Sequence, residues 1–360
     1  MTSQPKLGAY QRLVGWLGDS FREQFAIYLA LTVILVGLNE VVGFGTNIAN
    51  WDPLYISGVL TLVIALRLAV EIPPKAHETL TRLANRGAIE LTPMKLKAIH
   101  KKLETEAGRW AAWGGPIVAV AVLLGFYSVF RFEGQVFFTI LATIGGFVAG
   151  RFLGRAAAYG QMGTLLKRES VTLHVQPGQL DGAGGFKPVG DLFFYQAFVI
   201  GLAAAFLAIW SLLIPLFPYY SRWRDVYVGL LAIAVLFEML GFFGPMWSFH
   251  TAMRDLKAQL TKEADRWMEE IGRLQGQVVQ APPNADTKAQ QERLALLIER
   301  CRAIDDLPTW PVDADIRRKF TVGNLGLFLP LLGYVIRVQT PDGQSVWSVL
   351  QGILEGLTKG

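Results

Sequence analysis

Residues 192–221 read LFFYQAFVIGLAAAFLAIWSLLIPLFPYYS, a stretch of 30 residues without a charged side chain. A helix needs about 20 mostly apolar residues to cross the hydrocarbon core of a bilayer, which is about 30 Å thick. A core helix of a water-soluble domain does not require so long an uncharged run. The stretch therefore predicts a membrane-spanning helix, and the rest of the sequence is best interpreted as that of an integral membrane protein.

Other uncharged runs extend this interpretation along the chain. Trp110–Phe130 is uncharged for 21 residues, and Gln24–Asn39 and Gln135–Gly150 are uncharged for 16 residues each. Two shorter runs resume after single charges, at Arg67 and Glu238. The sequence thus predicts six spanning helices, near residues 24–45, 54–72, 112–130, 136–154, 193–216 and 226–248.

A seventh candidate lies near the C-terminal end. Residues 320–336 form an uncharged run of 17 residues that contains Asn324 and Pro330. The run is long enough to span only without tilt, so a spanning helix and a re-entrant or interfacial segment both stay open. The predicted fold class is an all-α integral membrane protein, with six or seven transmembrane helices in hairpins and a cytoplasmic helical hairpin module.

Composition excludes several classes of protein. Only 18% of the 360 residues are charged and 52% are hydrophobic, whereas typical soluble domains are about 25% charged. The single cysteine excludes a disulfide framework and a thiolate-built metal centre, and four histidines leave few combinations for another metal site. A net charge of +5 does not indicate nucleic-acid binding. We expect no metal and no cofactor, with membrane lipids as partners.

The positions of lysine and arginine predict the orientation. If the N-terminus is cytoplasmic, the segments on the inner side hold 28 basic residues and the three outer loops hold 3. Basic residues accumulate on the cytoplasmic side of membrane proteins, so we expect a multi-pass protein of the bacterial inner membrane with its N-terminus inside. The first 20 residues lack the continuous apolar core of a cleaved signal peptide.

The sixth span is predicted to continue into the cytoplasm as a long helix. Met253, Leu260, Trp267 and Leu274 keep a seven-residue spacing, and after a break at APPN (281–284) a second amphipathic helix follows. An antiparallel helical hairpin is the simplest arrangement. The predicted organisation is a cytoplasmic segment (1–23), a first transmembrane hairpin (24–72), cytoplasmic basic helices (73–111), a second hairpin (112–154), a helix extension with a glycine-rich loop (155–192), a third hairpin (193–248), the cytoplasmic helical hairpin (249–319), the seventh candidate (320–336) and a tail (337–360).

The glycine-rich loop is the most unusual cytoplasmic segment. Residues 171–191 read VTLHVQPGQLDGAGGFKPVGD, a short strand-like alternation followed by tight turns. Backbone N–H groups in such turns can cradle an anion. A compact turn in which Asp181 caps its own backbone and a metal held by His174 and Asp181 are the alternatives. The candidate anion- or ligand-binding residues are His174, Asp181, Gly182, Gly184 and Gly185.

Two basic segments adjoin the predicted membrane. Thr92-Pro93 is an N-cap followed by proline at the first helical position, and Lys95, Lys97, Lys101 and Lys102 follow it. Such a face binds anionic lipid or faces solvent, and the alternative partner is an anionic signal such as a nucleotide. After the LPTWPVD elbow (307–313), we expect the basic trio to contact lipid head groups; it consists of Arg317, Arg318 and Lys319.

Charges at membrane depth are costly and are usually paired or functional. Glu238 is the deepest, Arg67 and Arg151 lie nearer the inner face, and Glu40 lies near the outer end of the first span. Glu238 is predicted either to pair with Arg67 or Arg151, to be a neutral carboxyl bonded to a neighbouring helix, or to line a pathway for cations.

Small residues predict closely packed helix faces. Gly146, Gly150 and Gly154 recur at four-residue spacing in the fourth span, and Gly201 lies on a similar face of the fifth. This spacing lets helix backbones approach each other. The partner can be a helix of the same chain or of a second subunit, and the sequence favours the former.

Two stretches, HVQPGQLDGAGGFKPVGDLFF (174–194) and DLPTWPVDADIRRKF (306–320), resemble segments of a broad group of uncharacterised bacterial polytopic membrane proteins. In that group a loop rich in proline, aspartate and glycine precedes a span. Some proteins of this general build are effectors of anti-phage defence that open or perturb the inner membrane. The resemblance covers about 36 residues and implies no catalytic residue.

The sequence carries no recognisable selectivity-filter, zinc-protease, serine-hydrolase or kinase motif, and we expect no enzyme. The predicted function is a homo-oligomeric inner-membrane channel, or channel-like effector, gated by the cytoplasmic helical module through an anionic signal or a partner protein. A secondary transporter and a membrane sensor or scaffold without transport are the alternatives.

Overall fold

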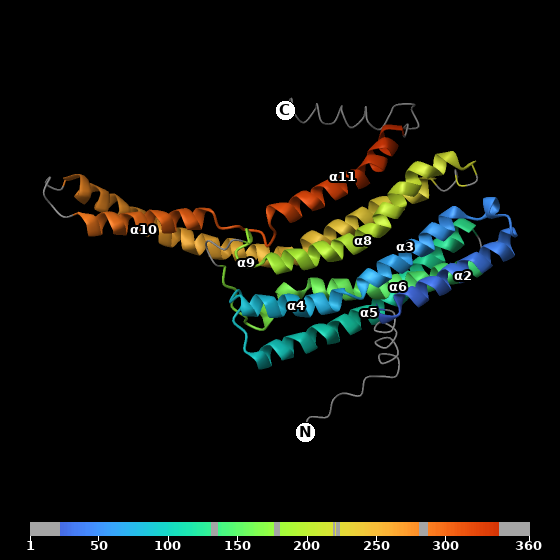
Figure 1. Ribbon diagram of the computed structural model, residues 1–360, viewed down its shortest axis with the longest axis horizontal. Helices are drawn as coiled ribbons and strands as arrows, with labels where there is room; N and C mark the ends of the chain where they lie inside the picture. The colour runs from blue at the N-terminus through green and yellow to red at the C-terminus, as the bar shows by residue number, and fades with distance from the viewer. Residues whose placement is uncertain are drawn as a thin grey trace, which may run out of the picture.

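The computed structural model describes residues 22–130, 136–175, 181–218, 220, 224–280 and 287–337. This part of the chain is almost entirely helical (Figure 1), and its only strand-like pairing is an isolated antiparallel bridge between Ile89 and Leu173. The alternation at 171–175 therefore forms no sheet. The α-helices are α2 (Phe25–Phe44), α3 (Pro53–Ala69), α4 (Ile72–Asn85), α5 (Pro93–Phe130), α6 (Val136–Gly160), α7 (Met162–Arg168), α8 (Lys187–Leu213), α9 (Arg224–Gln280), α10 (Lys288–Asp305) and α11 (Ala314–Arg337).

Five helical stretches in the described residues are long and apolar enough to cross a membrane, which confirms the class of membrane protein. They are Phe25–Gly43, Pro53–Asn85, Pro93–Gly125, Lys187–Leu216 and Arg224–Gln280. Figure 1 shows the long helices lying roughly along one axis, with the α9–α10 hairpin extending from one end of the bundle. The helix α6 also matches a predicted span, but it is not among the five.

One helix runs further than the sequence predicted, and a second has the predicted continuation. The predicted cytoplasmic basic helix and the third span form one helix of 38 residues, α5, which is continuous through Pro116. The predicted cap is present, since the Thr92 hydroxyl accepts a hydrogen bond from the Lys95 N–H at 3.3 Å. The predicted continuation of the sixth span is confirmed, since α9 is a single helix of 57 residues that contains Pro245 and extends from that span into the α9–α10 hairpin.

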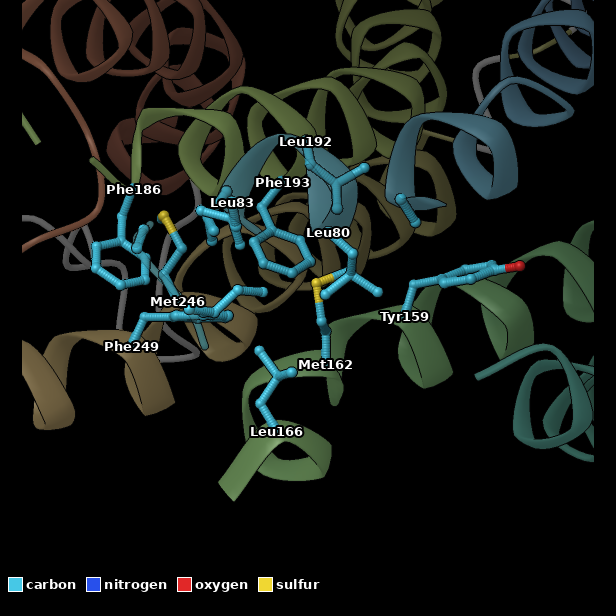
Figure 2. Close-up of a cluster of buried hydrophobic side chains, with 14 of the residues drawn as sticks. Leu80, Leu83, Tyr159, Met162, Leu166, Phe186, Leu192, Phe193, Met246 and Phe249 are labelled. Carbon is cyan, nitrogen blue, oxygen red and sulfur yellow. The ribbon is translucent and has the colours of Figure 1, made fainter. Parts of the chain in front are cut away.

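A buried apolar core joins the helices at the end of the bundle from which the hairpin extends (Figure 2). The amphipathic helix α4 contributes Leu80 and Leu83, which are fully buried. They meet Met162 of α7, Phe193 of α8 and Phe249 of α9, which are equally buried. Burial of such side chains contributes about 1.5–3 kcal/mol each, so this core fixes how the helices are arranged at that end.

The helix α11 extends along α8 and α9. Midway, Leu327, Phe328 and Leu331 pack against a cluster formed by α8 and α9. At one end Asp313, just before α11, contacts Lys187 at the start of α8. At the other end the Tyr334 hydroxyl donates a hydrogen bond of 3.0 Å to Asp225 at the start of α9. The helices α8 and α9 run in opposite directions, so their starts lie at opposite ends of the pair. The helix α11 therefore extends from one end of this pair to the other.

Candidate functional site

Glu238 occupies a buried position where α9 meets α11. Its side chain is almost fully enclosed, with only 6% of the residue exposed. The Asn324 amide nitrogen of α11 donates a hydrogen bond to Glu238 Oε1 at 3.4 Å and another to the Phe320 carbonyl at 3.0 Å. Of the interpretations open at the sequence level, the structure therefore favours a carboxyl group bonded to a neighbouring helix over an ion pair with arginine.

Gly201 of α8, the third helix at this position, leaves space for the Glu238 carboxyl group. A Cβ added to Gly201 would lie 2.8 Å from Glu238 Oε1 and 3.0 Å from Oε2, which is closer than real contacts allow. A carboxyl group can therefore lie against the α8 backbone only because residue 201 has no side chain. We call Glu238, Asn324 and Gly201 the three-helix site.

Two oxygen atoms of the three-helix site have no hydrogen-bond partner within the described structure. They are Glu238 Oε2 and Asn324 Oδ1, and both are buried. Buried polar atoms are nearly always hydrogen-bonded, because leaving one unpaired costs about 1–3 kcal/mol. The pair of unpaired acceptors marks this site as one where a proton or a ligand completes the bonding.

The other charges predicted at membrane depth lie elsewhere. Arg67 binds Glu71 at 2.8 Å on the helix turn that links α3 to α4, and Arg22 binds the same carboxylate at 3.1 Å. The Arg151 guanidinium lies over the Phe147 ring, 5.8 Å from its centroid. Glu40 is fully buried and accepts a 2.8 Å hydrogen bond from the N–H of residue 52, so it anchors the start of α3.

The predicted glycine face of α6 packs on α5 of the same chain. A Cβ at Gly150 would collide with the Gly114 carbonyl, and a Cβ at Gly154 would collide with the Trp110 carbonyl. Gly146 lies against Val122, where a Cβ would be 2.8 Å from a methyl carbon. We call this contact the glycine seam. The intramolecular arrangement favoured by the sequence is the one that the structure shows.

The glycine-rich loop is a turn that Asp181 caps. The Asp181 carboxylate accepts hydrogen bonds from the N–H groups of Ala183 and Gly185 at 3.0 and 3.1 Å, and it binds Arg86 at 3.2 Å. Gly182, Gly184 and Gly185 have positive φ, as the turns require. Two N–H groups of the loop are thus already occupied by Asp181, and the structure favours the self-capped turn over the anion cradle.

The described residues of the loop form no metal site either. His174 Nε2 lies 3.1 Å from the Glu90 carboxylate, whereas Asp181 pairs with Arg86. Among the residues that the structure describes, no group of three or more histidine, cysteine, aspartate or glutamate side chains is placed to hold a metal ion. The alternative of a metal held by His174 and Asp181 is therefore not supported.

The two stretches that carried the family resemblance pack against each other. Lys187 at the start of α8 binds Asp313 before α11 at 2.6 Å. Gly190 lies so close to the Pro311 carbonyl that a Cβ would collide with it. We call this contact, between residues 182–190 and 308–313, the inner joint. It ties the start of α8 to the start of α11.

Asp313 holds the inner joint through both carboxylate oxygens. One oxygen binds Lys187, and the other accepts the Ile316 N–H at 2.8 Å, which caps α11. Burial would raise the pKa of this carboxyl, but the hydrogen bonds from Lys187 and Ile316 outweigh it and lower the pKa. The hydrogen bond to Asp313 in turn raises the pKa of Lys187.

The segment before Asp313 also lies on α9. The Trp310 ring stacks on the His250 ring with centroids 4.2 Å apart, and His250 Nδ1 lies 2.6 Å from the Thr309 carbonyl. Two turns further along α9, the Lys257 ammonium donates to the carbonyls of Asp305 and Leu307 at 2.7 and 3.0 Å. These contacts of His250 and Lys257 therefore link α9, and with it the α9–α10 hairpin, to the segment that leads into α11.

The basic trio lies at the start of α11. Arg317, Arg318 and Lys319 are all exposed, and Lys319 binds Asp315 at 2.6 Å. Their contact with lipid head groups stays a prediction. The residues that sequence reasoning missed are those that partner Glu238; the one available signal was Asn324, a polar residue within an apolar run.

Comparison of the chain with family models, with curated proteins and with solved structures gave no match.

Proposed function

We propose that the chain is a homo-oligomeric, multi-pass protein of the bacterial inner membrane that forms a channel, or channel-like effector, gated from the cytoplasm by the α9–α10 hairpin. The observation that carries the proposal is the continuity of α9, a helix of 57 residues that includes both Glu238 of the three-helix site and one of the two helices of the hairpin. A helix transmits rotation or translation along its axis. Movement of the hairpin therefore reaches Glu238 without an intervening loop.

The proposal includes seven spans with the N-terminus inside, formed by α2, α3, α5, α6, α8, α9 and α11. The contacts of α11 with residues near opposite ends of the bundle, Asp313 with Lys187 and Tyr334 with Asp225, support a spanning rather than a re-entrant α11. Its 24 residues correspond to about 36 Å, and its uncharged residues 320–336 to about 26 Å, close to the thickness of about 30 Å of the hydrocarbon core.

The transporter alternative receives less support. Transporter sites are typically formed by discontinuous helices. Unwinding is expected in two helices, and both are continuous across the positions concerned, which are Gly241, Gly244 and Pro245 in α9 and Asn324 and Pro330 in α11. A role in anti-phage defence rests on the family resemblance alone and belongs to the proposal as its physiological setting, with an anionic signal or a partner protein as the trigger.

The test is ion flux into liposomes that contain the purified protein. Within the hairpin, Arg293 of α10 binds Glu270 of α9 at 2.6 Å. We expect Arg293→Glu to change the flux, and Glu270→Arg combined with Arg293→Glu to restore it, because the reversed pair rebuilds the contact. Arg300→Glu is the control, since Arg300 is exposed on the same helix. Flux that is absent from all preparations, or equal in all of them, contradicts the proposal.

A further inference from the structure

One additional proton would satisfy both unpaired acceptors of the three-helix site. Asn324 donates to Glu238 Oε1, yet Asn324 Oδ1 and Glu238 Oε2 are both buried acceptors without a donor. The two acceptors belong to the same amide and the same carboxyl group that are already joined. If Oε2 carries a proton, the carboxylic acid and the amide can form a cyclic pair with two hydrogen bonds, in which each group donates once and accepts once.

A proton fits this site better than a metal cation does. A sodium or calcium ion takes about six oxygen ligands, whereas the site offers two unpaired oxygens. Gly201 also lies directly against the carboxyl group, where even a Cβ would be only 2.8 Å from Oε1. The α8 side therefore has no room for an ion with its coordination shell.

The charges on the packed helices do not replace the proton. On α11 the nearest are Arg317, Arg318 and Lys319, at least five residues before Asn324, and the titratable Tyr334 lies beyond it, bonded to Asp225. On α9 itself the nearest titratable groups are Tyr227 and His250, followed by Asp225, Arg224 and Arg254. On α8 the titratable groups are Lys187 and Asp191, toward its start, and Tyr195, whose hydroxyl donates to the Leu68 carbonyl. The charges of α6, which also packs on α9, are Arg151 and Arg155.

We propose that the three-helix site is a proton-binding site, in which Glu238 is held as a neutral carboxylic acid paired with the Asn324 amide and so fastens α11 to α9. Loss of the proton places a negative charge on Oε2 beside the lone pairs of Asn324 Oδ1, in a buried site where an unpaired charge is costly. Ionisation thus separates α11 from α9 or admits water between them. The inference depends on the packing of these helices and not on what crosses the membrane.

The direct test is infrared spectroscopy of the full chain in lipid, because a protonated carboxyl group has a carbonyl band distinct from that of a carboxylate. We expect a protonated-carboxyl band at neutral pH that is lost in Glu238→Gln and shifted in Asn324→Leu, which removes the amide partner. Asp225→Asn, at the outer end of the α9–α11 contact, is the control and leaves the band unchanged. Absence of the band from the wild type, or a band that Asn324→Leu leaves unmoved, overturns the proposal.

Hydrogen exchange provides a second readout. Glu238→Gln keeps an uncharged partner for Asn324 at every pH, so comparing it with the wild type at the same pH cancels the intrinsic pH dependence of exchange. We expect faster exchange of α11 amides in the wild type at alkaline pH and equal exchange in the two proteins at acid pH. Equal exchange at every pH overturns the release of α11. Neither readout uses ion flux, so a failure of the proposed channel and a failure of the proton site remain distinguishable.

Discussion

The glycine seam and the three-helix site are both close contacts between apolar helices, but backbone atoms form the first and polar side chains form the second. In the glycine seam, α5 and α6 meet backbone to backbone, and Gly114, Gly150 and Gly154 leave no polar side chain between them. In the three-helix site, Gly201 opens a comparable space, but Glu238 and Asn324 fill it. The first contact depends only on shape, whereas the second depends on shape and on a protonation state.

This difference assigns different roles to the two parts of the bundle. A contact made of backbone atoms has no titratable group and no alternative partner, so it forms a fixed unit. A contact completed by one buried acid can be altered by a proton or by a movement of α9. The contacts of His250 and Lys257 attach the segment before α11 to the hairpin end of α9. We therefore expect conformational change to concentrate in α8, α9 and α11, while α5 and α6 remain in place.

The largest effect is expected at the glycine seam. Replacing Gly150 with leucine forces a side chain into the Gly114 carbonyl, and neither backbone can move without separating α5 from α6. We expect a loss of about 3 kcal/mol or more in the free energy of unfolding. Thermal unfolding in detergent measures it, with Gly229→Leu as the control because a Cβ there meets nothing within 4 Å. Equal stability of the two variants would show that the seam does not hold the helices together.

A smaller effect is expected at the stack of Trp310 on His250. Trp310→Ala removes the ring contact at 4.2 Å and the packing on Phe243 and Trp247. Because Trp310 is only partly buried, we expect about 2 kcal/mol, below the 3–5 kcal/mol of a fully buried tryptophan. Trp113→Ala, at a position that is 69% exposed, is the control and costs less. If Trp310→Ala leaves both thermal stability and exchange at residues 306–313 unchanged, the inner joint does not depend on this stack.

Local signals made the helices predictable from sequence. Runs without charge marked the apolar helices, the seven-residue spacing from Met253 to Leu274 indicated that α9 continues beyond the membrane, and Thr92-Pro93 marked the start of α5. Each of these signals lies within one stretch of chain. Hydropathy and capping act over a few residues, so a single sequence is sufficient to detect them.

Contacts between distant residues were not predictable. Glu238 and Asn324 are 86 positions apart, and Lys187 and Asp313 are 126 apart. No periodicity relates such pairs, because they meet only after the helices pack. The same reason left the partner of the Gly146–Gly154 face open. The loop at 181–185 stayed open between an anion cradle and a turn capped by its own aspartate, because both use the same residues and Arg86, which binds Asp181, lies 95 positions away.

Asp313 tests the inner joint with a defined pH dependence. Asp313→Ala removes a helix cap and an ion pair, and we expect a loss of about 1–2 kcal/mol, whereas Asp313→Asn keeps a capping side chain and loses less. The pKa of Asp313 is lowered in the folded chain, so its contribution is present above the unfolded pKa and is lost as the pH falls through the folded one. Stability measured against pH should therefore fall in acid for the wild type, and less so for Asp313→Ala. An identical acid profile in both proteins would contradict the role of this carboxylate.

The smallest effect is expected where α4 meets α5, outside both contacts compared above. His77 and His100 stack with ring centroids 4.5 Å apart, and the Nε2 atom of each is buried without a hydrogen-bond partner within the described structure. Burial, and then the neighbouring His77, lowers the pKa of His100 below its ordinary value of 6.5. A lowered pKa means that stability is full above the unfolded value and is lost as the pH falls through the folded one.

His100→Gln should therefore flatten the stability profile below neutral pH, with a change of less than about 1 kcal/mol, because Gln cannot gain a charge beside His77. Thermal unfolding between neutral and mildly acid pH measures this, and His250→Gln is the matched control because His250 lies at the inner joint instead. Since the α4–α5 contact adjoins the fixed unit, acid should loosen α4 without changing hydrogen exchange along the glycine seam. If exchange at Gly150 and Gly154 rises together with that of α4, the two parts of the bundle do not act separately.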